Sequence, residues 1–218
     1  MSFFDSIPKP PPRAPERHPR PAWLRPEAVL PGSVQGELVL ARTDEVAIAI
    51  GSIRAYPNGF EFTVHVRFRE AAADFGPGHD PFSWHRRGHG GSGPPDVLRL
   101  GVAYADGRRT ATTSGQPGPG DEDDGQLRLM HQGGGGSALG FDQNFWLYPL
   151  PPQGPVAFVA AWLEFGVPEV TAEIDAAAIQ AAAERAVVLW PEQPGDESCG
   201  AWNSETITAH RPAKAGEE

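Results

Sequence analysis

The sequence has little that would direct the chain to disulfide bonding, membrane insertion or nucleic-acid binding. Its 218 residues include one cysteine, Cys199, so no disulfide can form within the chain. No apolar run approaches the ~20 residues that span a bilayer, and the N-terminus lacks the basic and apolar segments of a signal peptide. The formal net charge of -10 disfavours contact with a phosphate backbone. We therefore expect a cytoplasmic protein that binds neither membrane nor nucleic acid.

The motifs of common catalytic and metal sites are also missing. Ser114 and Ser137 lie in glycine-rich stretches without a Gly-x-Ser-x-Gly elbow, and Cys199 has no base beside it. The glycines at 133–136 are not followed by the Lys-Ser/Thr of a phosphate-binding loop, and neither Cys-x-x-Cys nor His-Glu-x-x-His occurs. The acidic run 121–124 reads as a solvated loop. We expect no catalytic residue, no metal and no cofactor, and the sequence favours a non-enzymatic protein.

Glycine and proline are abundant, and proline marks off the first part of the chain. Residues 8–21 read PKPPPRAPERHPRP, which excludes a helix or inner strand because proline fixes φ and donates no hydrogen bond. This run predicts a polyproline II or disordered arm, either a strap along the protein's own body or a ligand for a proline-recognising domain. We predict a Pro-rich arm over 1–32, a single β-rich domain over 33–191 and an irregular tail over 192–218.

Within the predicted domain, apolar residues mostly alternate as they do in β-strands. The clearest strand is 60–68, whose apolar residues point to one side. The opposite side is polar and predicts a solvated face, made of Glu61, Thr63, His65, Arg67 and Arg69.

Local turn signals connect the predicted strands. Asn58-Gly59 and Asp106-Gly107 predict tight hairpin turns, and Gly51 predicts a bulge or close approach. The glycines at 133–136 indicate a flexible or tightly turned segment. We assign four aromatic residues to the core in preference to a ligand groove: Phe145, Trp146, Tyr148 and Trp162.

The apolar period becomes helical near residue 175. Asp175 is a good N-cap, and an alanine-rich run follows it to Leu189, shortly before Pro191. Eight or nine strands, mostly joined by hairpin-length turns, precede this single helix. The fold class that we predict is therefore mainly β: an antiparallel β-sandwich or open barrel with one C-terminal α-helix.

Several stretches together resemble a group of uncharacterised β-rich proteins of high-GC actinobacteria. They are LVLARTD at 38–44, AYPNGFEF at 55–62, DQNFWLYPLPPQGP at 142–155, the strand around Trp162, EID at 173–175 and LWP at 189–191. The resemblance covers about residues 37 to 191. It implies a shared fold and a bacterial cytoplasmic setting, but no known activity or catalytic residue comes with it.

Two basic groups are the candidates for ligand binding. His65 and Arg67 share the solvated face of the strand at 60–68. The second group lies in the loop HDPFSWHRRGH at 79–89 and consists of His85, Arg86, Arg87 and His89. Such side chains can pair with a carboxylate or phosphate, or with the acidic run at 121–124. A metal is disfavoured because two adjacent arginines repel a cation, and the glycines oppose the helix that would align the histidines.

Two hypotheses of function follow. The first is a non-enzymatic β-sandwich that binds a protein partner, forms a homo-oligomer or belongs to a larger assembly. The second is a small-ligand or metal-binding protein, or an enzyme, that uses the His/Arg-rich loop at 79–89 with the polar strand face. Convergence of His65, His85 and His89 on a carboxylate would favour the second hypothesis.

Overall fold

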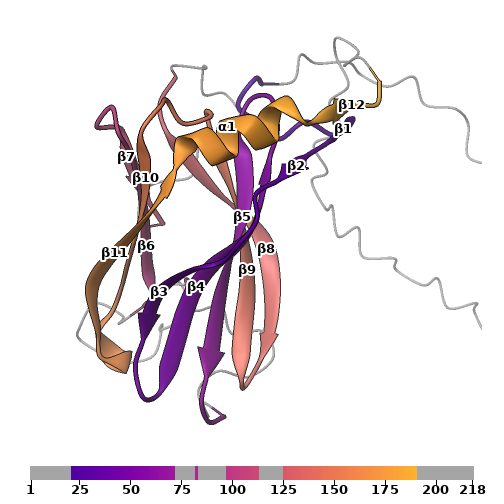
Figure 1. Ribbon diagram of the computed structural model, residues 1–218. Helices are drawn as coiled ribbons and strands as arrows, with labels where there is room; N and C mark the ends of the chain where they lie inside the picture. The colour runs from indigo at the N-terminus through magenta and orange to yellow at the C-terminus, as the bar shows by residue number, and fades with distance from the viewer. Residues whose placement is uncertain (1–20, 72–81, 83–96, 113–124, 191–218) are drawn as a thin grey trace, which may run out of the picture. The chain divides into compact units, whose positions relative to one another are not determined.

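The computed structural model describes residues 21–71, 82, 97–112 and 125–190, which belong to the compact unit Pro21–Glu192. Two antiparallel sheets make up most of this unit, and α1 lies across one end of them (Figure 1). The prediction of an antiparallel β-sandwich with one helix is confirmed, and the sheets do not close into a barrel.

The larger sheet holds six strands in the order β2-β4-β5-β9-β8, with β3 also paired to β4. Its strands are β2 (Gly32–Ser33), β3 (Leu38–Arg42), β4 (Val46–Ala55), β5 (Phe60–Phe68), β8 (Arg128–Ser137) and β9 (Gly140–Tyr148). All pairings in this sheet are antiparallel.

The smaller sheet holds four strands in the order β11-β10-β6-β7. These are β6 (Arg99–Tyr104), β7 (Arg109–Ala111), β10 (Pro155–Trp162) and β11 (Val167–Asp175), with a short 3-10 helix, Leu163–Phe165, before β11. A separate two-stranded ribbon pairs β1 (Val29–Leu30) with β12 (Val187–Val188).

The predicted hairpins and the predicted bulge are present. At Asn58-Gly59, the backbone N–H of Tyr56 donates to the Gly59 carbonyl at 2.8 Å, which closes the turn between β4 and β5. At Asp106-Gly107, Gly107 has a φ of 89°, a conformation that glycine adopts without a steric penalty. The register of β4 against β5 shifts between Gly51 and Arg54, so a bulge lies where Gly51 indicated one.

The core lies between the inner faces of the two sheets. Phe62 of β5 contacts Phe158 of β10 edge to face, with ring centroids 5.1 Å apart, and Phe68 contacts Trp162 at 6.0 Å. The four aromatic residues assigned to the core are all buried, and Trp146 is fully excluded from solvent. Phe145 and Trp162 belong to the core between the sheets, where their burial stabilises the sandwich, whereas Trp146 and Tyr148 belong to a second buried cluster.

The predicted N-cap of the helix is confirmed, but the helix is shorter than the alanine-rich run indicated. Asp175 accepts a hydrogen bond from the backbone N–H of Ala177 at 2.9 Å, and α1 spans Ala176–Glu184. The chain then leaves the helix because β12 pairs with β1, and the Leu189 N–H donates to the Ala28 carbonyl at 2.8 Å. No helix in the described part of the chain is long and apolar enough to cross a membrane.

The expectation of a flexible or tightly turned segment at 133–136 is wrong. These glycines belong to β8 and pair with β9 from Gly133↔Asn144 to Gly136↔Phe141. β8 and β9 form a hairpin, in which cross-strand pairing with residues close in sequence outweighs the low strand propensity of glycine.

Residues 21–32, which the sequence analysis places in the arm, include side chains that are packed on the outer face of the larger sheet. Trp23 is 6% exposed, and its backbone carbonyl accepts a hydrogen bond from the Trp146 indole N–H at 2.8 Å. Trp23, Val29, Tyr56, Met130, Trp146 and Tyr148 form a second apolar cluster there.

We predict that Gly32→Ala destabilises the fold by about 1–3 kcal/mol, because a methyl group at residue 32 would overlap the backbone of Ala182 in α1. Urea unfolding followed by circular dichroism measures this change. Gly101→Ala is the matched control, since its methyl group would meet neighbours only at 3.5 Å or beyond. Equal stability of the two variants would contradict close packing of α1 on β2.

Candidate functional site

The outer face of the larger sheet carries polar side chains above a floor of small residues. The outward residues of β5 are Thr63, His65 and Arg67. On β4 they pair with Gly51, Ala49 and Ala47, in that order. On β9 they pair with Asn144, Asp142 and Gly140. The side chains of His65, Arg67 and Asp142 are 25%, 53% and 50% exposed. A ligand can therefore reach these polar groups from solvent.

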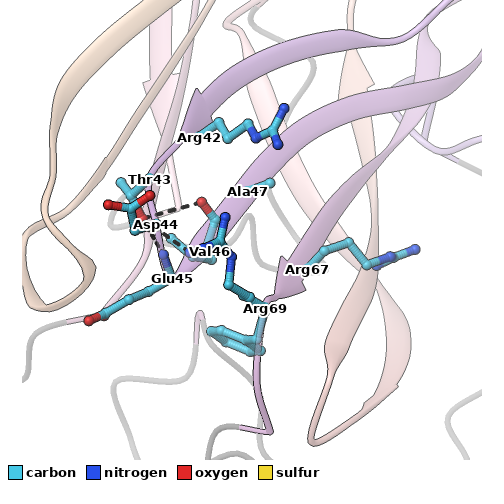
Figure 2. Close-up of a pocket in the computed structure, with 9 residues that line it drawn as sticks. Arg42, Thr43, Asp44, Glu45, Val46, Ala47, Arg67 and Arg69 are labelled. Carbon is cyan, nitrogen blue, oxygen red and sulfur yellow. Dashed lines mark hydrogen bonds between the residues drawn. The ribbon is translucent and has the colours of Figure 1, made fainter.

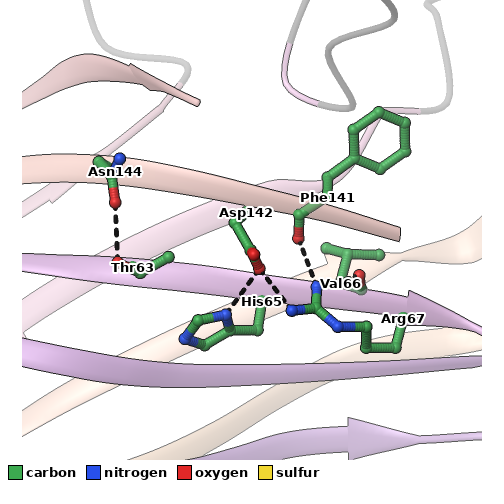
Figure 3. A network of polar contacts seen from close by, with 7 residues as sticks. All are labelled: Thr63, His65, Val66, Arg67, Phe141, Asp142 and Asn144. Atoms are coloured by element: carbon green, nitrogen blue, oxygen red, sulfur yellow. Dashed lines mark hydrogen bonds and ion pairs between the residues drawn. The ribbon is translucent and has the colours of Figure 1, made fainter. Parts of the chain in front are cut away.

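Asp142 is the centre of a polar network on this face (Figure 3). One carboxylate oxygen, Oδ1, lies 2.7 Å from His65 Nδ1 and 2.7 Å from Arg67 Nη2. Arg67 Nη1 also donates to the backbone carbonyls of Val66 and Phe141, each at 2.9 Å. These contacts fix the Arg67 guanidinium in one place across β5 and β9.

The network also sets the charge state of Asp142. Partial burial by itself would raise the pKa of this carboxyl group, but hydrogen bonds from His65 and Arg67 and the charge of Arg67 outweigh it. The pKa of Asp142 therefore lies below its usual range. Asp142 is ionised at neutral pH and compensates the charge of Arg67.

Two glycines make room for the network. A Cβ atom at Gly140 would lie 2.4 Å from the Val66 carbonyl oxygen and 3.0 Å from Arg67 Cδ, so the arginine stem crosses β9 where no side chain stands. A Cβ atom at Gly51 would lie 3.0 Å from His65 Nε2, which places the imidazole ring directly over the β4 backbone. The small floor residues thus allow long polar side chains to lie flat on the sheet.

A pocket of about 220 Å³ adjoins the network at the turn between β3 and β4 (Figure 2). Its lining combines the turn with the end of β5: Arg42, Thr43, Asp44, Glu45, Val46, Ala47, Arg67, Phe68 and Arg69. Thr43 fixes the turn, because its Oγ1 accepts hydrogen bonds from the backbone N–H groups of Glu45 and Val46 at 3.2 and 3.1 Å. The backbone around the pocket is therefore held in place by hydrogen bonds.

The three arginines of the pocket do not all extend in the same direction, because the Arg69 side chain runs toward Val46 at the turn (Figure 2). Figure 2 shows Arg42 and Arg67 extending to one side, whereas the carboxylates of Asp44 and Glu45 lie on the other. Within the described residues, neither Arg42 nor Arg69 forms an ion pair, whereas Arg67 pairs with Asp142. The pocket thus presents two guanidinium groups that form no ion pair with a described carboxylate, although Asp44 and Glu45 line the same pocket.

Part of the face predicted to be solvated is covered. Glu61 is 4% exposed and Thr63 8% exposed. The Glu61 carboxylate accepts from Arg25 Nη1 at 2.7 Å and from the Tyr56 hydroxyl at 3.0 Å, and it pairs with Arg54 Nε at 2.7 Å. The expectation of a wet face at Glu61 is therefore wrong, because the segment around Trp23 and Arg25 lies over it.

The second group of candidates cannot be compared with the first. His85, Arg86, Arg87 and His89 lie outside the described residues, so the structure does not test whether they converge with His65. Among the residues that are described, no group of three or more His, Cys, Asp or Glu side chains is placed to hold a metal ion.

Sequence reasoning named Arg67 and His65 but missed Asp142 and Arg42 as members of the site. The alternation of Phe141, Asp142 and Phe145 within β9 was a usable signal, because it leaves Asp142 facing away from the core. What the sequence could not provide was the pairing of β9 with β5, which joins residues 77 positions apart.

No protein-family model, curated protein or solved structure matches this chain.

We predict that Asp142→Asn changes how stability depends on acid. The pKa of Asp142 is lower in the folded protein than in the unfolded chain, where it is near ~4. Asp142 therefore adds to the free energy of unfolding above pH ~4, and this contribution is lost as the pH falls through the pKa of the folded state. The wild type should exceed the variant at pH ~6 by less than about 1 kcal/mol, since the pair is half exposed, and this difference should shrink toward pH ~2.

Urea unfolding across this pH range provides the measurement, with Asp44→Asn as the control. Asp44 is exposed and forms no ion pair with the described part of the chain. A difference between wild type and Asp142→Asn that does not vary with pH would argue against the network as the cause.

Proposed function

We propose that this chain is a non-enzymatic binding protein whose outer sheet face holds a protein partner that presents carboxylate side chains. One observation carries the proposal: Arg42 and Arg69 border a pocket on this face and pair with no carboxylate in the described residues. An arginine without an acidic partner at a pocket is a ready donor for a carboxylate of another molecule.

The shape of the surface supports an extended partner. The floor consists of Ala47, Ala49 and Gly51 along β4 and Gly140 on β9, so few side chains stand above the backbone near the arginines. A peptide chain can approach such a surface closely while its acidic side chains reach into the pocket. Asp142 keeps Arg67 oriented beside this path, so the third arginine contributes a fixed donor group.

The hydrogen bonds of the face support binding in preference to catalysis. The Thr63 hydroxyl donates to Asn144 Oδ1 at 2.8 Å, and His65 bonds to Asp142. Among the described residues, no hydroxyl or thiol group hydrogen-bonds to His65, so no nucleophile is paired with a base there. The alternative function, a small-ligand or metal-binding protein or an enzyme based on the loop at 79–89, depends on residues that the structure does not describe.

We predict that a fluorescently labelled hexaglutamate peptide binds the protein and that Arg42→Ala combined with Arg69→Ala weakens this binding at least about tenfold. The expected loss follows from removing two charge-assisted hydrogen bonds, each of which contributes about 1.5–3 kcal/mol. Fluorescence anisotropy at two salt concentrations measures the affinity, which should fall as salt increases.

Arg99→Ala is the control, because Arg99 is also exposed but lies on β6 of the other sheet. It should bind the peptide as the wild type does. The proposal fails if the wild type does not bind hexaglutamate, or if the double variant binds it with unchanged affinity. Competition by free glutamate at millimolar concentration would instead indicate a site for small carboxylates.

A further inference from the structure

Strand β8 ends the larger sheet, and its outer edge is unpaired within the residues that the structure describes. One edge of β8 pairs with β9 from Arg128↔Tyr148 to Ser137↔Gly140. No strand in the described part of the chain pairs with the other edge of β8. In an antiparallel pair, alternate residues direct their N–H and C=O groups away from the partner. The outer side of β8 therefore presents a row of backbone donors and acceptors.

The other strands at sheet ends carry features that discourage pairing, and β8 does not. Strand β2 is only two residues long, β7 is three residues long and begins with Arg109, and β11 contains Pro168, Glu169 and Glu173. Strand β3, which pairs only with β4, is five residues long and ends at the exposed Arg42. In contrast, residues 129–137 of β8 contain no charged residue and no proline. Short length, charge and proline are the usual protections of an exposed edge, so β8 has the longest edge in the described fold without them.

A bulge limits the regular part of this edge to the glycines and Ser137. The register of β8 against β9 shifts between His131 and Gly133, and pairing then continues without interruption to Ser137↔Gly140. Residues 134–137 are exposed to solvent. The available edge is thus the segment Gly133–Ser137.

The packing of the fold explains two glycines of this segment but not the one at its centre. Cβ atoms at Gly134 and Gly136 would overlap the backbone carbonyl oxygens of Asp142 and Gly140, so these positions need glycine to pair with β9. A Cβ atom at Gly135 would meet no atom within 4 Å. A side chain at this position is therefore tolerated by the fold, so Gly135 can be substituted to test the edge without disturbing the pairing with β9.

We propose that the segment Gly133–Ser137 binds the same segment of a second copy of this chain, in antiparallel register about Gly135. When the same strand of two identical chains pairs in antiparallel orientation, a two-fold axis relates the two chains, and this is the most common symmetry of protein dimers. The chain has a net charge of -10, so two copies repel each other over most of their surfaces. Contact through a segment without charge keeps this repulsion smallest.

Such a dimer joins the two larger sheets into one continuous sheet. The outer faces of both copies then form a single surface with two arginine pockets. A partner with two acidic segments could engage both pockets, which raises its apparent affinity above that for one pocket. The dimer itself does not depend on what the pockets bind.

Sedimentation velocity of the full chain from about 1 to about 200 µM tests the proposal. We expect the wild type to shift from monomer to dimer across this range. Gly135→Lys places a charge at the centre of the contact in space that the fold leaves empty, and should require at least tenfold higher concentration to dimerise. Gly135→Ala, whose methyl group meets nothing in the same space, should dimerise like the wild type. Circular dichroism verifies that each variant is folded.

A cross-link locates the contact. In a Cys199→Ser background, which has no other cysteine, Gly135→Cys should form a disulfide-linked dimer on mild oxidation. Val39→Cys is the control, because Val39 is 63% exposed on β3 of the same sheet and should not cross-link. A wild type that stays monomeric throughout, a Gly135→Lys variant that dimerises as readily, or cross-linking of Val39→Cys alone would overturn the proposal.

Discussion

The antiparallel pairing of β5 with β9 is the constraint on which the core and the site both depend. In this register Phe62 stands opposite Phe145, with ring centroids 5.6 Å apart, and His65 stands opposite Asp142. A slip of one residue would turn every side chain of β9 to the other face, so Asp142 would enter the core and Phe145 would leave it. The energy that fixes the position of Asp142 beside His65 is therefore the burial of aromatic rings on the opposite face of the sheet.

The arginines on the outer face of the larger sheet lie in two different environments. Arg25 and Arg54 neutralise Glu61, a carboxylate that the N-terminal segment covers, and the Tyr56 hydroxyl provides a further donor. A buried carboxylate with these partners is costly to disturb, because removing one partner leaves a charge without compensation in a poorly solvated place. Arg42 and Arg69 face solvent, and neither compensates a buried carboxylate among the described residues. This contrast supports the proposal that a partner binds at the end of the sheet near the β3–β4 turn, whereas the region around Glu61 stabilises the fold.

Features governed by neighbours in sequence could be predicted, whereas features governed by long-range pairing could not. Asn58-Gly59, Asp106-Gly107 and Asp175 act within a few residues, and each occupies the turn or cap that its chemistry favours. The end of α1 depends on pairing between β12 and β1, residues more than 150 positions apart, which overrides the helix propensity of the alanine-rich run. In the site, His65 and Arg67 were visible as the polar side of an alternating strand. Their partner Asp142 and the neighbouring Arg42 required the register of three strands, which one sequence does not contain.

The small ribbon formed by β1 and β12 has a consequence for how the chain can be rearranged. Val29 lies opposite Val188, so segments near the two ends of the sandwich body meet although nearly its whole length separates them. A linker that joins the chain after β12 to the chain before Trp23 would close the body into a ring without changing any strand pairing. New termini could then be opened at the exposed Asp106-Gly107 turn, where Gly107 has no neighbour within 4 Å of a would-be side chain. The order of the strands along the chain is thus separable from their order in space.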